Sequence, residues 1–66
     1  MTITVNGDRR EVVGARTVAE LVKELELPPV AILVEHNELA LRHDEWTERT
    51  LAENDRVEFV RIVAGG

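Results

Sequence analysis

The sequence predicts an α+β fold in which one helix packs across one face of a mixed sheet of about four to five strands. Three observations carry this prediction. The chain opens on an alternating segment that ends in Asn6-Gly7, its middle holds one helical apolar stripe, and it closes on a segment rich in β-branched residues. At 66 residues without repeats or linkers, these elements are expected to form one small domain.

The first predicted element is a β-hairpin. Residues 2–5 alternate polar and apolar side chains, and Asn6-Gly7 follows them directly. Both turn residues tolerate positive φ, which a two-residue type I′ turn requires. We therefore expect the chain to turn back into a second strand at about residues 9–13.

A helix is expected to begin at Val18. Thr17 precedes Glu20 by three residues, which is the spacing of a capping box. Apolar side chains then recur at helical spacing and form one stripe that faces the core, namely Val18, Leu21, Val22 and Leu25. Pro28-Pro29 is predicted to stop the helix, because proline lacks an amide donor and disfavours helical geometry in the preceding residue.

The second half of the chain is predicted to contain three strands. A strand is predicted over residues 30–35, a turn over 35–38 and a short strand over 39–41. The charged stretch 44–49 is predicted to be a loop or single helical turn anchored by Trp46 in the core. After a turn at residues 53–55, the last strand is predicted over residues 57–62. The order is β-β-α-β-β-β, with a domain over residues 1–62 and a flexible tail over 63–66.

Composition limits the chemistry that the chain can perform. It has no cysteine, which leaves no thiol nucleophile and no thiolate metal site. The two histidines, His36 and His43, are interpreted as exposed loop residues, and no metal site is predicted. A net charge of −5 argues against nucleic-acid binding and favours a basic protein partner. Without a targeting or membrane-spanning segment, a cytoplasmic location away from membranes is expected.

The chain end is the one place where chemistry is predicted. The last strand continues into Val63 and Ala64 and then into Gly65 and Gly66. Glycine has no Cβ, so it lets the backbone enter a narrow channel and leaves the terminal carboxylate sterically open. Such a carboxylate can attack the α-phosphorus of ATP, and a sulfur or nitrogen nucleophile can then displace AMP. The protein would be the substrate of this chemistry and not the enzyme.

A docking face is predicted beside that end. Side chains alternate along the last strand, so burying Val57 and Phe59 against the helix would leave Glu58, Val60 and Ile62 on the opposite face. Exposed apolar residues next to a functional tail suggest a partner site.

The chain resembles the ubiquitin-like β-grasp sulfur carriers, and most closely the ThiS-like family of thiamin (thiazole) biosynthesis. The resemblance covers nearly the whole chain and rests on the order of several pieces. These are residues 3–7, 17–21, 34–38, the Glu45-Trp46 pair, and residues 54–63 leading to the terminal glycines. Arg42, Asn54 and Ala64 depart from residues that are common in the family.

The resemblance implies a cycle at Gly66. An adenylyltransferase related to ubiquitin-activating enzymes would use ATP and magnesium to activate its carboxylate. Sulfur derived from cysteine through a desulfurase would convert it to a thiocarboxylate (a C-terminal 1-thioglycine), which thiazole synthase would consume. Gly65 and Ala64 would thread the tail into the partners, and the chain itself would hold no cofactor.

Three alternatives remain at this point. The small subunit of molybdopterin synthase has the same fold and end, but it usually has a proline shortly before the glycines, and residues 61–63 contain none. A ubiquitin-like protein modifier would use the same activated carboxylate. A plain interaction domain would carry an inert tail.

Overall fold

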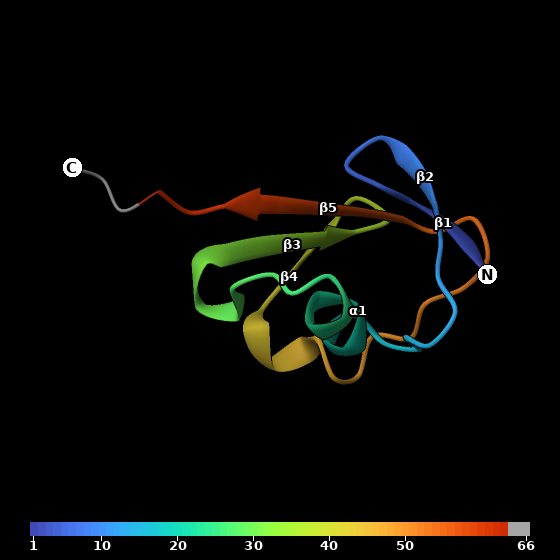
Figure 1. The fold of residues 1–66 in the computed structure, drawn as a ribbon. Helices are drawn as coiled ribbons and strands as arrows, with labels where there is room; N and C mark the ends of the chain where they lie inside the picture. Colours follow the sequence, from blue (N-terminus) through green and yellow to red (C-terminus); the bar gives the residue numbers. More distant parts are fainter. Residues whose placement is uncertain (64–66) are drawn as a thin grey trace.

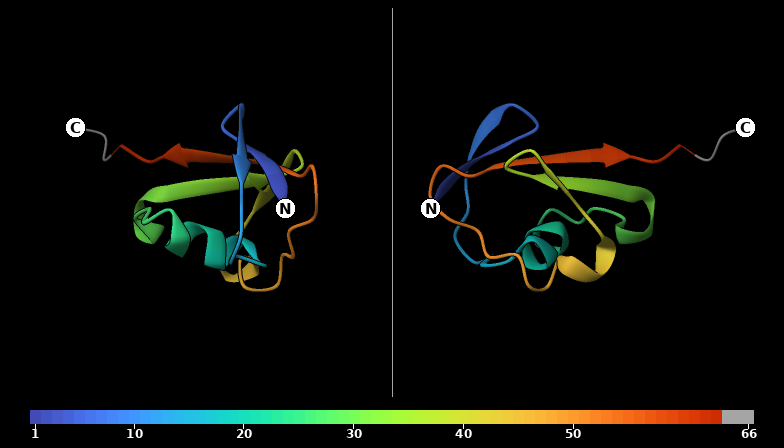
Figure 2. Two further views of the ribbon diagram at one scale, coloured as in Figure 1. Left: turned by 45° about the vertical axis from the view of Figure 1, so that its right-hand side comes forward. Right: turned by 180° about the vertical axis from the view of Figure 1, so that it is seen from behind.

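The architecture is that of one sheet covered on one face by one helix. The computed structural model describes residues 1–63. Within these residues, five strands form a single mixed sheet in the order β2-β1-β5-β3-β4, and helix α1 (Val18–Glu24) packs across one face (Figure 1). The turned views in Figure 2 separate the two layers. The predicted α+β fold and the order of its elements are confirmed.

The first hairpin pairs β1 (Thr2–Val5) with β2 (Asp8–Glu11) in antiparallel register. Asn6 and Gly7 have φ angles of 48° and 86°, the left-handed pair that a type I′ turn requires. The predicted hairpin is confirmed, but its second strand ends earlier than expected. Val12 still donates its amide to the Met1 carbonyl, at 2.7 Å, while its side chain is buried in the core.

Helix α1 begins where the capping box predicts. The Thr17 hydroxyl accepts from the Glu20 amide at 3.2 Å, and the Glu20 carboxylate accepts from the Thr17 amide at 3.2 Å. These reciprocal bonds satisfy amides that have no partner inside the helix.

The end of α1 differs from the prediction, because the prolines do not stop the helix. Glu26 adopts a φ of 56°, its amide bonds the Lys23 carbonyl, and the Leu27 amide reaches back to the Val22 carbonyl at 3.1 Å. This is a Schellman motif with glutamate in the left-handed position where glycine is usual. The helix therefore ends before Pro28 is reached.

The prolines instead shape the entry to the third strand. Pro29–Ala31 forms a 3-10 turn, η1, and β3 covers Ile32–His36, so the predicted strand start at Val30 is wrong. Proline fits the first position of such a turn, because its missing amide would be unpaired there. The following turn contains only Asn37 and Glu38, with φ angles of 50° and 71°, and leads into β4 (Leu39–Leu41).

A second 3-10 turn, η2 (His43–Glu45), leads into Trp46, which is 4% exposed. This confirms the predicted helical turn anchored by a core tryptophan. The Trp46 carbonyl accepts from the Ala19 amide at 3.1 Å, and the Arg49 carbonyl accepts from the Val18 amide at 2.9 Å. The loop thus satisfies two further amides at the start of α1 and is held against it.

Strand β5 (Arg56–Arg61) is the centre of the sheet. It pairs in parallel with β1 and antiparallel with β3, and it starts and ends one residue before the predicted range. The Asn6 side chain extends the ladder, because it accepts from the Phe59 amide at 2.7 Å and donates to the Phe59 carbonyl at 3.2 Å. Figure 1 shows β5 running away from the end of the molecule that holds the N-terminus.

The core lies between the sheet and α1 and is mainly aliphatic. Its least exposed large side chains come from the helix, from β1, β3 and β5, and from the segment after β2: Ile3, Leu21, Val12, Val18, Val34 and Val57. Leu25 and Phe59 are partly buried against this cluster. A continuous core of this kind fixes which face of each strand points outward.

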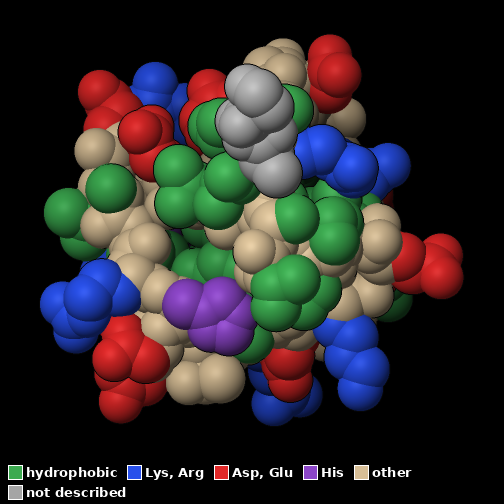
Figure 3. Space-filling model, turned by 90° about the vertical axis from the view of Figure 1, so that its left-hand side faces the viewer, with side chains coloured by type: hydrophobic (Ala, Val, Ile, Leu, Met, Phe, Trp, Pro, Cys, Tyr) green, Lys and Arg blue, Asp and Glu red, His purple; other side chains and the backbone are tan. Residues whose placement is uncertain are grey.

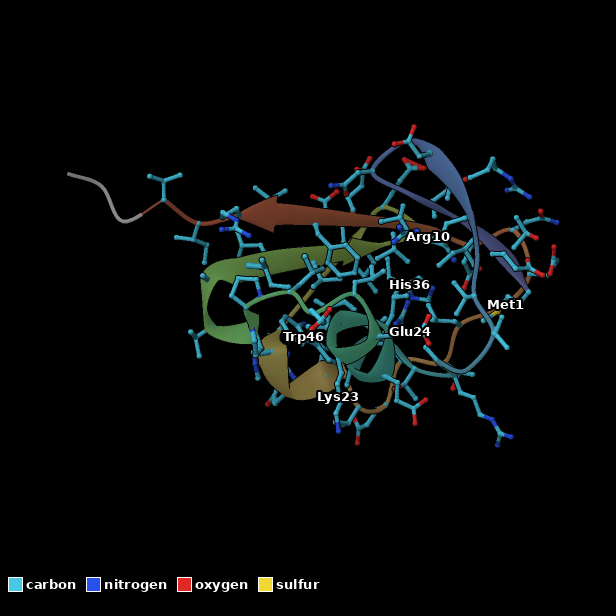
Figure 4. All side chains as sticks on the ribbon, viewed as in Figure 1. Met1, Arg10, Lys23, Glu24, His36 and Trp46 are labelled. Carbon is cyan, nitrogen blue, oxygen red and sulfur yellow. The ribbon has the colours of Figure 1, made fainter. Side chains whose placement is uncertain are left out.

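His36 corrects one prediction, because it is a buried residue and not an exposed loop residue. It is 4% exposed and lies between the sheet and the helix (Figure 4). Its Nδ1 accepts from Arg49 Nε at 3.2 Å, so Nε2 carries the proton and donates to Asp55 at 2.7 Å. Both ring nitrogens are therefore paired, as is usual for polar groups buried in a core.

Asp55 joins the two loops at this end of the sheet. Its carboxylate accepts from Asn37 Nδ2 at 3.0 Å and from the Ala52 amide at 2.8 Å, besides His36. Burial alone would raise the pKa of Asp55, but the hydrogen bonds from Asn37, His36 and Ala52 outweigh it and lower the pKa below 3.8.

We expect Asp55→Asn to destabilise the fold by about 1.5–3 kcal/mol near neutral pH, the usual contribution of hydrogen bonds to a charged group. Since the pKa of Asp55 is lowered in the folded state, its contribution is fully present above the unfolded pKa. It is lost as pH falls through the folded pKa, so the gap between wild type and variant should narrow below about pH 4. Urea unfolding at several pH values measures this gap, with Glu48→Gln as an exposed control. A gap that is unchanged in acid would contradict the prediction.

Candidate functional site

The outward face of β5 is the part of the predicted site that the structure describes. Val57 is fully buried and Phe59 packs against the core, while Val60 and Ile62 are 52% and 48% exposed and Glu58 is also exposed. The predicted alternation along the last strand is confirmed. Whether Glu58, Val60 and Ile62 bind a partner stays a prediction.

Leu33 is a third apolar residue of this face, and sequence reasoning did not single it out. It is 56% exposed and lies directly opposite Val60 in the antiparallel pairing of β3 with β5. The Ile62 amide donates to the Ala31 carbonyl at 2.7 Å and prolongs this pairing beyond the strand. Leu33, Val60 and Ile62 together form what we call the outer apolar patch. The alternation of buried Ile32 and Val34 around Leu33 is the signal that could have found it.

Acidic side chains border the outer apolar patch. Glu58 lies directly opposite Glu35 in the β3–β5 register, and both are exposed. Like charges in directly opposite positions destabilise a sheet, so this arrangement is unfavourable for folding alone. A basic surface on a partner would relieve the repulsion, which agrees with the net charge of −5.

The end of the molecule where β5 stops is rich in hydrophobic side chains. Figure 3 views this end and shows hydrophobic side chains gathered on it. Val30 in η1 and Val63 after β5 are 90% and 81% exposed, in addition to the outer apolar patch. Exposed apolar surface of this extent is typical of a protein interface.

The predicted reactive end lies beyond what the structure describes. Ala64, Gly65 and Gly66 are outside residues 1–63, so their predicted roles in threading and activation stay predictions. What the structure does place is the root of the tail: Val63 lies two residues after β5 and next to Ile62, whose amide bonds the Ala31 carbonyl. The last residues of β5 are held in the sheet by their pairing with β3.

Other chemistry has little support among residues 1–63. No group of three or more metal-binding side chains is found among them, and His36 is fully engaged with Arg49 and Asp55. In the same part of the chain, no helix is long and apolar enough to cross a membrane.

A mixed five-stranded sheet with one helix across one face is the fold of the ubiquitin-like β-grasp class, and here an exposed apolar patch lies beside the end of its last strand. Comparison with known proteins gives the family. Residues 3–66 match the model described as the ThiS family, so the chain belongs to the ThiS family of ubiquitin-like sulfur carriers. A carrier of this kind is not itself a catalyst.

Two solved structures from Geobacter metallireducens are similar to the chain, and both are described as a thiamine biosynthesis protein. The crystal structure is 33% identical, with a TM-score of 0.85 over 100% of both chains. The NMR structure is also 33% identical, with a TM-score of 0.80 over 100% of this chain and 88% of the other. No curated protein matches the chain.

Proposed function

We propose that the chain carries sulfur for thiazole formation in thiamin biosynthesis, as a thiocarboxylate on Gly66. Membership of the ThiS family is the observation that carries this proposal. The exposed apolar face beside the root of the tail supports it, because a carrier must dock on each enzyme that handles its end.

The proposed chemistry has two steps. A carboxylate oxygen of Gly66 attacks the α-phosphorus of ATP and releases pyrophosphate, in an adenylyltransferase related to ubiquitin-activating enzymes that also supplies magnesium. A sulfur nucleophile then attacks the glycyl carbonyl and displaces AMP. With hydrosulfide as that nucleophile, the products are a thiocarboxylate, AMP and a proton. In the cell the sulfur would come from cysteine through a desulfurase.

The thiocarboxylate is then the sulfur donor for thiazole synthase. It is more acidic than a thiol, so it stays anionic at neutral pH and nucleophilic. The chain contributes no acid, base or metal to either step in this proposal. Its residues dock the domain and deliver the carboxylate.

Intact-mass analysis tests this function. After reaction with ATP, magnesium, the activating enzyme and a sulfur source, the protein should gain the mass of one oxygen-to-sulfur exchange, confined to the C-terminal peptide. A modification mapped to another position would refute the proposal. The absence of any modification, with an enzyme that does activate a related carrier, would also refute the proposal.

Val60→Glu is expected to keep the fold and weaken binding to the activating enzyme by about tenfold or more, because it places a charge in the centre of the outer apolar patch. Val60 is half exposed, so the stability change should stay near about 0.5 kcal/mol. Titration calorimetry with the enzyme measures the affinity. Val13→Glu is the matched control, since Val13 is 92% exposed and lies outside the outer apolar patch. Equal affinities for the two variants would show that the patch is not the docking face.

A further inference from the structure

Two glutamates form a like-charged pair next to the outer apolar patch, on the face of the sheet turned away from α1 (Figure 2). Glu35 on β3 and Glu58 on β5 lie directly opposite each other in the antiparallel register, and both are exposed. Directly opposite residues have Cβ atoms about 4.5–5.5 Å apart, so the two carboxylates repel each other. Each glutamate lies two residues from a member of the patch on its own strand, Leu33 or Val60, and therefore shares its face.

The neighbouring side chains leave this pair without a counterion. No ion pair is found for Glu35 or Glu58 among residues 1–63. Arg56, two residues before Glu58 on the same face, binds Glu38 at 2.6 Å instead. On the other side, the β4 residue opposite Glu35 is the small and exposed Ala40, which leaves the carboxylate accessible. The repulsion is therefore not relieved within the part of the chain that the structure describes.

A protein that covers the outer apolar patch also removes water from this pair. Two carboxylates that lose water without a counterion are strongly unfavourable, so a purely apolar partner surface would bind poorly. A second copy of the chain is disfavoured for the same reason, since two such faces in contact would bring two carboxylates from each copy together. An arginine or lysine of the partner would offset this loss, because its charge is attracted by both carboxylates.

We propose that the Glu35–Glu58 pair receives one basic side chain, an arginine or lysine, from the protein that covers the outer apolar patch. This inference rests on the proposed function, because it names the chemistry of the enzyme surface that receives the carrier: an apolar centre with a cation beside it. The pair then destabilises the free protein and contributes affinity in the complex. It also selects against partners that lack the cation.

Glu58→Lys separates stability from binding, because the two should change in opposite directions. In the free protein the lysine faces Glu35, and attraction replaces repulsion, so the melting temperature should rise by about 2–8 °C. In the complex the lysine faces the basic group of the partner, so the affinity for the activating enzyme should fall by at least about tenfold. Titration calorimetry without ATP or a sulfur source measures this affinity. Glu48→Lys is the matched control, because Glu48 is exposed and lies in the loop between η2 and β5.

Neutral variants test whether the two carboxylates act together. Glu35→Gln and Glu58→Gln each remove the same repulsion, so each should raise the melting temperature, and the double variant should be little more stable than either one. Each should weaken binding to the activating enzyme by about threefold. The affinity of the double variant should also depend less on salt than that of the wild type. Glu48→Gln is the control for the loss of one negative charge.

Three outcomes would overturn the proposal. The first is equal affinity of Glu58→Lys and Glu48→Lys for the enzyme. The second is tighter binding of the two glutamine variants, which would mean that the carboxylates only lose water against an apolar surface. The third is a double variant whose gain in stability is the sum of the single gains, because the carboxylates would then not interact. A carrier that takes up sulfur normally but fails these tests would refute this inference alone, whereas one that passes them but takes up no sulfur would refute the proposed function.

Discussion

Gly65→Val is expected to reduce ATP–pyrophosphate exchange by the activating enzyme by about a hundredfold or more, the scale of loss that follows when a reacting group is misplaced. The proposed channel must accept bare backbone, and valine adds a branched side chain one residue before the reacting carboxylate. Valine also restricts the backbone to fewer conformations than glycine. The terminal carboxylate itself is chemically intact in this variant.

The melting temperature separates this effect from misfolding. Residue 65 follows the end of β5 by four residues, so the free energy of unfolding should change by no more than about 0.5 kcal/mol. Gly65→Ala is the graded control, because its single methyl group should cost less activity than valine. Wild-type exchange in Gly65→Val would show that the glycine is incidental, and the proposed function would then rest on family membership alone.

Local chemistry allowed the sequence to predict much of the fold. The Asn6-Gly7 turn and the capping box at Thr17 each depend on a few neighbouring residues, and both are present as predicted. The alternation along β5 depends only on which face is buried, so the outward positions of Val60 and Ile62 were also predictable.

Predictions failed where a residue acts against its usual preference. Glu26 takes the left-handed position that glycine normally fills at a helix end, so the sequence contained no glycine to mark the end of α1. Val30 has a strong preference for strands, but it follows Pro29 into a 3-10 turn and leaves its side chain 90% exposed. In both cases local backbone hydrogen bonds, from Glu26 and Leu27 back into α1 and from Ala31 to Pro28, accompany a conformation that the residue's own propensity does not favour.

Distant contacts were the other source of error. The sequence around His36 is typical of a turn. Its hydrogen-bond partners Arg49 and Asp55, however, are 13 and 19 residues away in the sequence. The hydrogen bonds with these two residues satisfy both ring nitrogens of His36 and so make its burial favourable. No pattern in the neighbouring sequence predicts these bonds. The pocket of about 480 Å³ between α1 and η2 has the same origin, because these two elements meet only in the folded chain.

The proposed site has two parts: the sheet, which fixes where the tail begins, and the tail, which presents the carboxylate. Strand β5 lies between β1 and β3, and its ladder with β3 continues to the Ile62 amide. Among residues 1–63, the last backbone amide with a hydrogen bond in the sheet is that of Ile62, four residues before Gly66 in the sequence. A docked domain then limits how far the carboxylate can reach. Tail length should consequently matter as much as tail composition.

Deletion of Gly66 should test that dependence, and we expect a loss of exchange of about a hundredfold or more. Removing one residue shortens an extended chain by roughly 3.3–3.6 Å, which is far outside the tolerance of an in-line attack on phosphorus. Deletion of Val63 is the matched control, since it shortens the tail equally but keeps Gly65 and Gly66. If reach is limiting, both deletions should lose exchange while both proteins melt like wild type. Retained exchange after deletion of Val63 would show instead that the identity of the last residues, and not their distance from β5, governs activation.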